Sequence, residues 1–226
     1  MSPDPALRQR TIALVGLMGV GKSTIGRKLA QALELPFQDA DHEIEKAAGR
    51  SISEIFAERG EAEFRAGERR VIARMLDSGP HILATGGGAF MNAQTRALIK
   101  ERAVSVWLKA ELDVLVRRVG RKDTRPLLAG RDAREVLKTL MEERYPIYAE
   151  ADIVVETDER PAGATVAAII EGLGARVQPL LSPCEAGGGD REAVRGASGV
   201  SGLEARPLHH PADGPPPPLT GEEKCP

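Results

Sequence analysis

The chain has 226 residues, of which 42% are hydrophobic and 28% charged, a composition typical of a globular protein with one main domain and short extras. Its formal net charge of −2 and its 3% aromatic content argue against the basic field and the stacking surfaces that hold nucleic acids. Cysteine occurs only at Cys184 and Cys225, and no apolar run approaches the ~20 residues that span a bilayer, so we expect a cytoplasmic monomer that binds neither nucleic acid nor membrane.

A short N-terminal segment is followed by a predicted strand and a predicted helix. Residues 1–10 contain two prolines and no apolar run, and we expect a flexible N-terminus there. The segment Thr11–Val15 is apolar after its first residue, which predicts a strand buried on both faces of a parallel sheet. Apolar residues recur at helical spacing over Lys22–Leu33, which predicts a helix.

Shorter apolar runs alternate with charged, helix-like stretches through the rest of the chain. The runs are Pro36–Gln38, His81–Ala84, Val104–Leu108 and Ile153–Val155. This alternation predicts an α/β fold with a parallel sheet, whose ligands bind at the carboxyl ends of the strands. After about Gly174 the composition changes, with Gly187–Gly189 and Pro215–Pro218, and predicts a disordered tail over residues 175–226 behind a domain over 11–174.

A phosphate-binding pattern lies between the first strand and the first helix. The residues Gly16-Leu17-Met18-Gly19-Val20-Gly21-Lys22-Ser23 match the pattern G-x-x-x-x-G-K followed by Ser or Thr. In this pattern backbone N–H groups converge on phosphate oxygens, the lysine reaches the β and γ phosphates and the hydroxyl serves Mg²⁺. We therefore predict that a nucleoside triphosphate is bound by Gly19, Val20, Gly21, Lys22, Ser23 and Thr24.

Two further groups of residues follow predicted strands. Asp39 and Asp41 leave the second strand two residues apart, so on an extended segment both carboxylates would face the same side. One of them is then available to metal-bound water and the other to a substrate hydroxyl; the alternative is that either caps the helix expected near His42. The glycines Gly86–Gly88 follow the third strand and either form a plain turn or offer backbone N–H donors to a ligand.

Five arginines are candidates for the site. Arg65 follows the amphipathic stretch Ile52–Phe64, and Arg118 lies near the end of the helix predicted over Glu111–Val119. Arg125 precedes Pro126 in a loop, Arg144 lies on the helix before Pro146, and Arg160 follows the last predicted strand. Taken one at a time, each is as well explained as part of a solvated surface, where arginine usually lies.

The motifs taken together resemble the shikimate kinases over Thr11–Gly172. They comprise the phosphate loop, Asp39-Ala40-Asp41, Gly49-Arg50-Ser51-Ile52, Ile55-Phe56, Gly60-Glu61, Glu63-Phe64-Arg65, Gly86-Gly87-Gly88-Ala89 and Arg125-Pro126-Leu127-Leu128. The resemblance implies a three-layer α/β/α P-loop kinase with a five-stranded parallel sheet, a substrate-binding segment over about 41–70 and a mobile lid over about 120–132. The tail after Gly174 departs from the compact members of that family.

The same resemblance implies a role for each candidate residue. Asp39 would hold Mg²⁺ through water together with Ser23, and Asp41 would bind substrate hydroxyls and accept the proton. Arg65 and Arg144 would bind the substrate carboxylate beside the glycine loop. The remaining roles are the lid arginine Arg125, which joins Lys22 and Asp41 in catalysis, and the adenine-side arginines Arg118 and Arg160.

The reaction implied is transfer of the γ-phosphoryl group from MgATP to the 3-hydroxyl of shikimate, in the biosynthesis of aromatic amino acids. Such transfer depends on positioning and charge neutralisation more than on covalent chemistry. Two alternatives stay open. One is a gluconate kinase or another small-metabolite kinase of similar build, and the other is a nucleotide-binding regulator that transfers no phosphate.

Overall fold

Five parallel strands form one sheet in the order β2-β3-β1-β4-β5, which confirms the predicted α/β class. The computed structural model describes residues 8–120 and 132–177, all within the unit Met1–Pro183. The elements, in chain order, are β1 Thr11–Val15, α1 Lys22–Leu33, β2 Phe37–Asp39, α2 Ala40–Ala48, α3 Ile52–Leu76, β3 Ile82–Ala84, the 3-10 helix η2 Ala89–Met91, α4 Ala93–Arg102, β4 Ala103–Lys109, α5 Leu112–Val119, α6 Ala133–Tyr148, β5 Ile153–Glu156 and α7 Ala162–Val177. Arg125, nearly all of the expected lid and residues 178–226 lie outside the described ranges.

The sheet brings the ends of three strands to one edge. The central strand β1 is buried throughout and pairs with β3 and β4. In the register of the sheet, Ala84 of β3 lies opposite both Leu14 of β1 and Asp39 of β2. The residues that follow these positions therefore meet at the carboxyl edge, where parallel sheets bind ligands.

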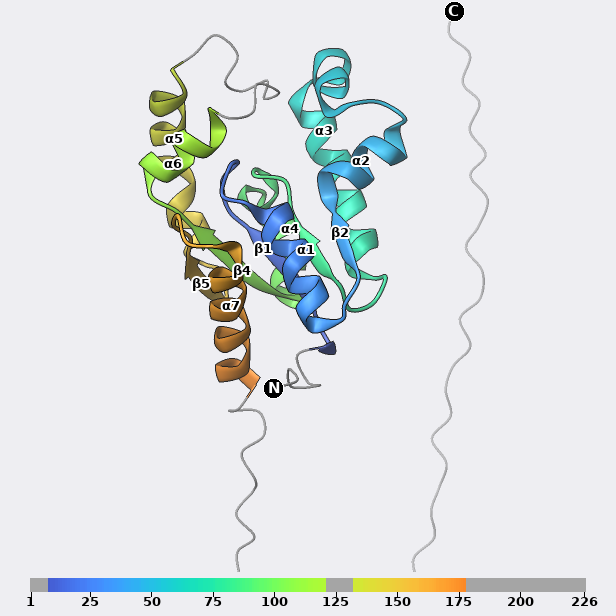
Figure 1. The fold of residues 1–226 in the computed structure, drawn as a ribbon. Coiled ribbons are helices and arrows are strands. Elements are labelled where there is room, and N and C mark those ends of the chain that lie inside the picture. Colours follow the sequence, from blue (N-terminus) through green and yellow to red (C-terminus); the bar gives the residue numbers. More distant parts are fainter. Residues whose placement is uncertain (1–7, 121–131, 178–226) are drawn as a thin grey trace, which may run out of the picture. The chain divides into compact units, whose positions relative to one another are not determined.

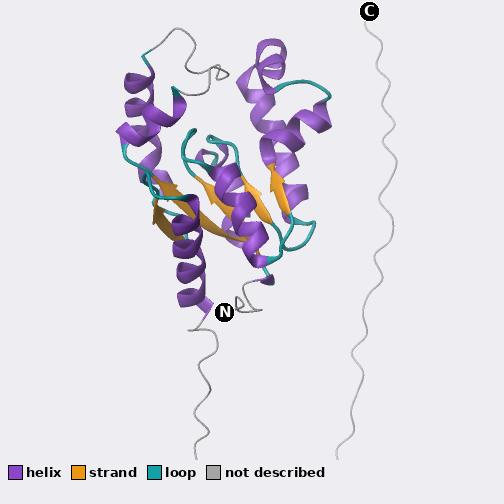
Figure 2. Ribbon diagram, viewed as in Figure 1, coloured by secondary structure: helices purple, strands orange, loops and turns teal. Residues whose placement is uncertain are grey.

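Helices cover both faces of the sheet and give the three layers seen in Figures 1 and 2. Helices α1 and α7 contact each other on one face, and α3 contacts α4 on the other. The main core combines fully buried strand residues such as Leu14, Leu83 and Val106 with helix residues such as Leu29 and Ile72. Within the described ranges, no helix combines the length and apolarity needed to cross a membrane.

Helices α2 and α3 carry a small hydrophobic cluster of their own. Ile44, Ile55 and Phe64 form this cluster apart from the main core. The helix α3 starts with a capping box between Ser51 and Glu54, and its helical dihedral angles are interrupted at Gly60, whose φ of 75° lies in the left-handed region. The interruption is a kink that divides α3 into two helical parts.

Candidate functional site

The phosphate loop Gly16–Thr24 joins β1 to α1. The loop approaches β4 so closely that a β-carbon on Gly16 would lie 2.7 Å from the Leu108 carbonyl oxygen, and the φ of Gly16 is 138°. Only glycine meets both conditions. Lys22 folds over the loop, and its ammonium group donates to the carbonyl oxygens of Gly16 at 2.8 Å and Leu17 at 3.0 Å. The loop amides and the start of α1 together make a concentrated positive site for phosphate oxygens.

Ser23 and Asp39 form the pair predicted for a metal ion. The Ser23 hydroxyl donates to the Asp39 carboxylate at 2.7 Å, which joins the start of α1 to the end of β2. The other oxygen of that carboxylate accepts from the Asp41 backbone N–H at 3.2 Å and caps α2. Asp39 therefore caps the helix, as one of the two alternatives predicted, and it also accepts a hydrogen bond from Ser23. Among the described residues there is no group of three or more His, Cys, Asp or Glu side chains able to hold a metal, and Mg²⁺ bound at phosphates commonly uses only one or two protein ligands.

Asp41 also reaches the site, but by a route that differs from the one expected. It lies in the first turn of α2 and not on an extended segment, so the shared-side argument for the two aspartates was wrong. Both residues line the same cavity because α2 starts directly at the strand end. The surrounding protein removes part of the hydration of Asp41 and raises its pKa, the nearby Asp39 raises it further, and Lys22 opposes the shift.

Arg65 is held on α3 by two acidic side chains of very different exposure. Its Nη1 donates to Glu68 at 2.8 Å, and its Nε and Nη2 lie at 3.4 and 3.3 Å from one oxygen of Glu61. The Glu68 side chain is 2% exposed while that of Glu61 is 68% exposed. Burial raises the pKa of Glu68, and the neighbouring Arg65 offsets only part of that shift. Sequence reasoning missed Glu68, although an acid three residues after an arginine on a helix is a recognisable signal.

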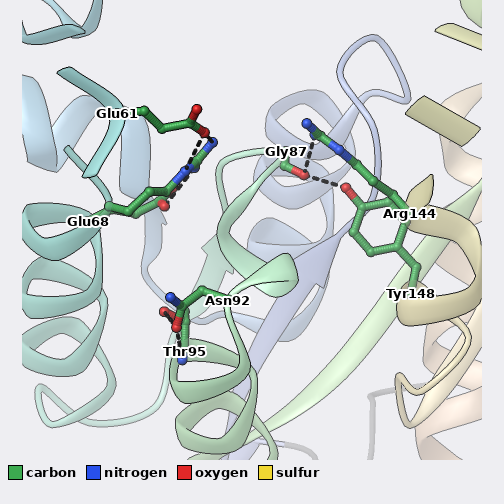
Figure 3. A network of polar contacts seen from close by, with 8 residues as sticks. Glu61, Glu68, Gly87, Asn92, Thr95, Arg144 and Tyr148 are labelled. Atoms are coloured by element: carbon green, nitrogen blue, oxygen red, sulfur yellow. Dashed lines mark hydrogen bonds and ion pairs between the residues drawn. The ribbon is translucent and has the colours of Figure 1, made fainter. Parts of the chain in front are cut away.

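The glycine loop Gly86–Gly88 packs directly against these side chains. A β-carbon on Gly86 would lie 2.7 Å from an Asp41 carboxylate oxygen, and one on Gly88 would lie 2.5 Å from a guanidinium nitrogen of Arg65. Close approach therefore favours glycine at Gly86 and Gly88, beyond what a plain turn needs, whereas a β-carbon on Gly87 would meet no atom nearer than 3.5 Å. On the other side, Arg144 donates to the Gly87 carbonyl oxygen at 3.1 Å, and the Tyr148 hydroxyl donates to the same oxygen (Figure 3).

Arg118 and Arg160 also line the cavity, with unequal surroundings. The Arg118 guanidinium donates to the Val20 carbonyl oxygen at 3.0 Å and to that of Asp158, so it links the phosphate loop to the segment after β5. The Arg160 side chain is 66% exposed, and its Nε donates to the Asp158 carboxylate at 2.6 Å. Arg118 is therefore a fixed part of the wall, whereas Arg160 lies at its rim.

A single cavity of about 900 Å³ connects these groups. The phosphate loop residues Gly19–Thr24 form one part of its wall, and the other predicted residues that line it are Asp39, Asp41, Arg65, Gly86, Gly87, Gly88, Arg118, Arg144 and Arg160. The apolar side chains of Ile52, Phe56 and Phe64 add a wall near Arg65. The space therefore combines a phosphate cradle with a pocket that presents cationic, acidic and apolar groups, as expected for an acid bearing hydroxyl groups. Arg125 falls outside the described ranges.

Comparisons with known proteins agree with this arrangement. The family model described as Shikimate kinase matches residues 18–174. A shikimate kinase of Caulobacter vibrioides is 66% identical over 167 residues, which cover 74% of this chain and 84% of that protein. The solved structure of a shikimate kinase from Acinetobacter baumannii in complex with shikimate is 36% identical, with a TM-score of 0.72 over 78% of this chain and 98% of that one.

A gluconokinase from Sinorhizobium meliloti also has a similar structure, with a TM-score of 0.55 over 76% of this chain and 96% of that one. At 18% identity this likeness shows a common fold and nothing more. The family model and the extent of identity carry the assignment: the chain belongs to the shikimate kinase family.

Proposed function

We propose that the protein acts as a cytoplasmic monomer that transfers the γ-phosphoryl group of ATP to the 3-hydroxyl of shikimate. The observation that carries the proposal is the one cavity in which the phosphate loop, Asp41 and the arginines Arg65 and Arg144 all take part. An acid alcohol bound between the two arginines has its hydroxyl groups beside Asp41 and faces the end of a triphosphate held by the loop. This proximity supplies most of what phosphoryl transfer requires.

The nucleotide side supplies charge and fixed amides. When a nucleotide binds, the Lys22 ammonium group leaves the loop carbonyl oxygens, contacts the terminal phosphates and neutralises part of their charge. Ser23 and Asp39 offer a hydroxyl and a carboxylate 2.7 Å apart, an oxygen donor set that fits Mg²⁺. A Mg²⁺ ion held there would supply positive charge against the charge that develops on the phosphates. Arg118 and Arg160 are proposed to contact the adenine, and Arg125 to close over the transferring phosphate.

The acceptor side supplies a base and a carboxylate clamp. The raised pKa of Asp41, caused first by burial, makes its carboxylate a better proton acceptor than an ordinary aspartate. Within the part of the chain that the structure describes, the Nε and Nη2 atoms of Arg65 donate hydrogen bonds only to the exposed Glu61, at 3.4 and 3.3 Å. A substrate carboxylate can displace Glu61 there and make two parallel hydrogen bonds, while Glu68 keeps its hold on Nη1.

The test is a coupled ADP-release assay with shikimate, gluconate, nucleoside monophosphates and no acceptor. We expect turnover with shikimate and negligible turnover with the others. Turnover with gluconate in place of shikimate would overturn the acceptor assignment, and a lack of acceptor-dependent ADP release would favour the nucleotide-binding regulator. Omission and replacement of Mg²⁺ in the same assay tests the metal.

The variant Arg65→Ala tests, in the same assay, whether Arg65 binds the carboxylate of the acceptor. Arg65→Ala removes the fork that faces the acceptor but leaves the phosphate loop untouched. The KM for shikimate should rise by about 100-fold or more, as for the loss of a charge-assisted bidentate contact, while the KM for ATP changes by less than about twofold. Equal increases in both constants would contradict the role of Arg65.

A further inference from the structure

Hydrogen bonds hold every carbonyl group of the glycine loop. The Gly86 oxygen accepts from the Ala89 N–H at 3.2 Å, and the Gly88 oxygen accepts from the Met91 N–H at 3.1 Å. Those two bonds belong to the turn that leads into η2. The Gly87 oxygen is different, because its donors are the Arg144 and Tyr148 side chains of α6, far away in the sequence (Figure 3).

The Gly87 carbonyl needs such donors because the loop cannot orient itself. Glycine has no β-carbon to restrict φ and ψ, so three in succession leave their peptide planes free to rotate. A larger residue at Gly86 or Gly88 would stiffen the loop, but its β-carbon would displace the side chains of Asp41, Glu68 or Arg65. In a planar trans peptide the carbonyl and the following N–H point in opposite directions, so the donor that fixes the Gly87 oxygen also fixes the direction of the Gly88 N–H.

Tyr148 is well suited to act as this donor. Its side chain is fully buried, and the rings of Phe90, Trp107 and Tyr145 surround it with centroids 6.0 to 6.4 Å away. This packing leaves the phenol ring little freedom. Burial raises the pKa of Tyr148 to about 12, so its hydroxyl keeps its proton and can donate at neutral pH.

Arg144 and Tyr148 are four residues apart on α6 and therefore lie on the same face of the helix. We propose that Tyr148 is a positioning residue for the phosphoryl acceptor: its hydroxyl fixes the Gly87 carbonyl, and thereby the Gly88 N–H and the Arg144 guanidinium. The inference rests on the proposed function of Arg144 as a carboxylate-binding group. If the Tyr148 hydroxyl is removed, Arg144 is the one side chain of the described ranges that still donates to the Gly87 oxygen. The Arg144 guanidinium is then drawn toward the loop and away from the acceptor.

The test compares Tyr148→Phe with Tyr145→Phe. Tyr145 lies on the same helix, and its hydroxyl donates to the Ala110 carbonyl oxygen at 2.6 Å. Both variants lose one hydroxyl-to-carbonyl bond, but only the first frees the glycine loop. We expect Tyr148→Phe to raise the KM for shikimate by about tenfold, as for the loss of one buried hydrogen bond in the site, with the KM for ATP changed by less than about twofold.

The control variant and a second substitution decide between positioning and plain stability. Tyr145→Phe should lower the melting temperature about as much as Tyr148→Phe and leave both KM values near those of the wild type. Because Arg144 and Tyr148 share one acceptor, the effects of Arg144→Lys and Tyr148→Phe on the shikimate KM should also be less than additive. Equal KM changes in the two phenylalanine variants, or full additivity with Arg144→Lys, would overturn the proposal.

A measurement without any acceptor separates this inference from the proposed function. Amide hydrogen exchange over residues 85–91 should be faster in Tyr148→Phe than in Tyr145→Phe, whichever acceptor the enzyme uses. If the wild type does not phosphorylate shikimate but the loop shows this difference, the acceptor assignment fails and the role of Tyr148 in fixing the loop stands. Unchanged exchange in Tyr148→Phe would refute that role.

Discussion

The contact between Gly88 and Arg65 gives a sharp prediction for the variant Gly88→Ala. The backbone of Gly88, with φ of −100° and ψ of −9°, accepts alanine without strain. The new methyl group, however, would lie 2.5 Å from an Arg65 guanidinium nitrogen, whereas ordinary contacts begin near 3.4 Å, so the guanidinium must retreat by about 0.9 Å. Because the obstacle is the end of a flexible side chain, we expect a loss of less than ~1 kcal/mol in stability, about 2 to 4 °C in melting temperature.

The kinetic effect should be far larger than the effect on stability. A displacement of about 1 Å in a positioning group can reduce catalysis about 100-fold, so the KM for shikimate should rise by about 10- to 100-fold with the KM for ATP nearly unchanged. Steady-state kinetics in both substrates and a thermal melt measure the two effects. Gly67→Ala is the matched control, because a β-carbon at Gly67 on α3 meets only one side-chain atom, at 4.0 Å. An unchanged shikimate KM in Gly88→Ala would refute the reasoning.

Two further predictions concern stability. Burial lowers the pKa of His81 below its usual ~6.5. Between that pH and the lower pKa of the folded state, the unfolded chain binds a proton that the folded chain does not. As the pH falls through this range, the free energy of unfolding should therefore fall by up to about 1.4 kcal/mol per pH unit. His81→Gln should show a shallower fall between pH 7 and 5 in urea titrations; an identical slope would contradict this explanation. In Gly26→Ala the methyl group would lie 2.6 Å from the Phe37 ring, and overpacking should cost about 1 to 3 kcal/mol despite better helix propensity. Gly174→Ala, with open space around the new methyl, should not lose stability, and an equal loss in both variants would rule out the steric cause.

The strands and the phosphate loop could be predicted because their signals are local. The buried run Thr11–Val15 and the helix Lys22–Leu33 have the predicted bounds, and the second strand is displaced by only one residue, to Phe37–Asp39. Apolar runs specify buried strands wherever they are packed, and the pattern at Gly16–Ser23 contains the glycines and the lysine that its own geometry requires. The family resemblance extended this prediction to the acceptor side.

The acceptor side itself depends on contacts between distant segments. Nothing in the sequence around Glu68 indicates that it is buried beneath Gly86, and nothing around Tyr148 indicates that its hydroxyl reaches Gly87. The two aspartates illustrate the same point. Asp39 and Asp41 line the cavity because a helix starts at the strand end, and the extended geometry assumed from the sequence was wrong.

The succession of strands and helices, the phosphate loop and the family could all be predicted from the amino-acid sequence, because they depend on neighbouring residues and on patterns that persist along the chain. Folding settled which acid holds Arg65, how Arg144 contacts the glycine loop, and why glycine is favoured at Gly86 and Gly88. The physical reason is that burial and close contact arise when α2, α3 and α6 fold over one edge of the sheet, and no local pattern encodes the distances between them.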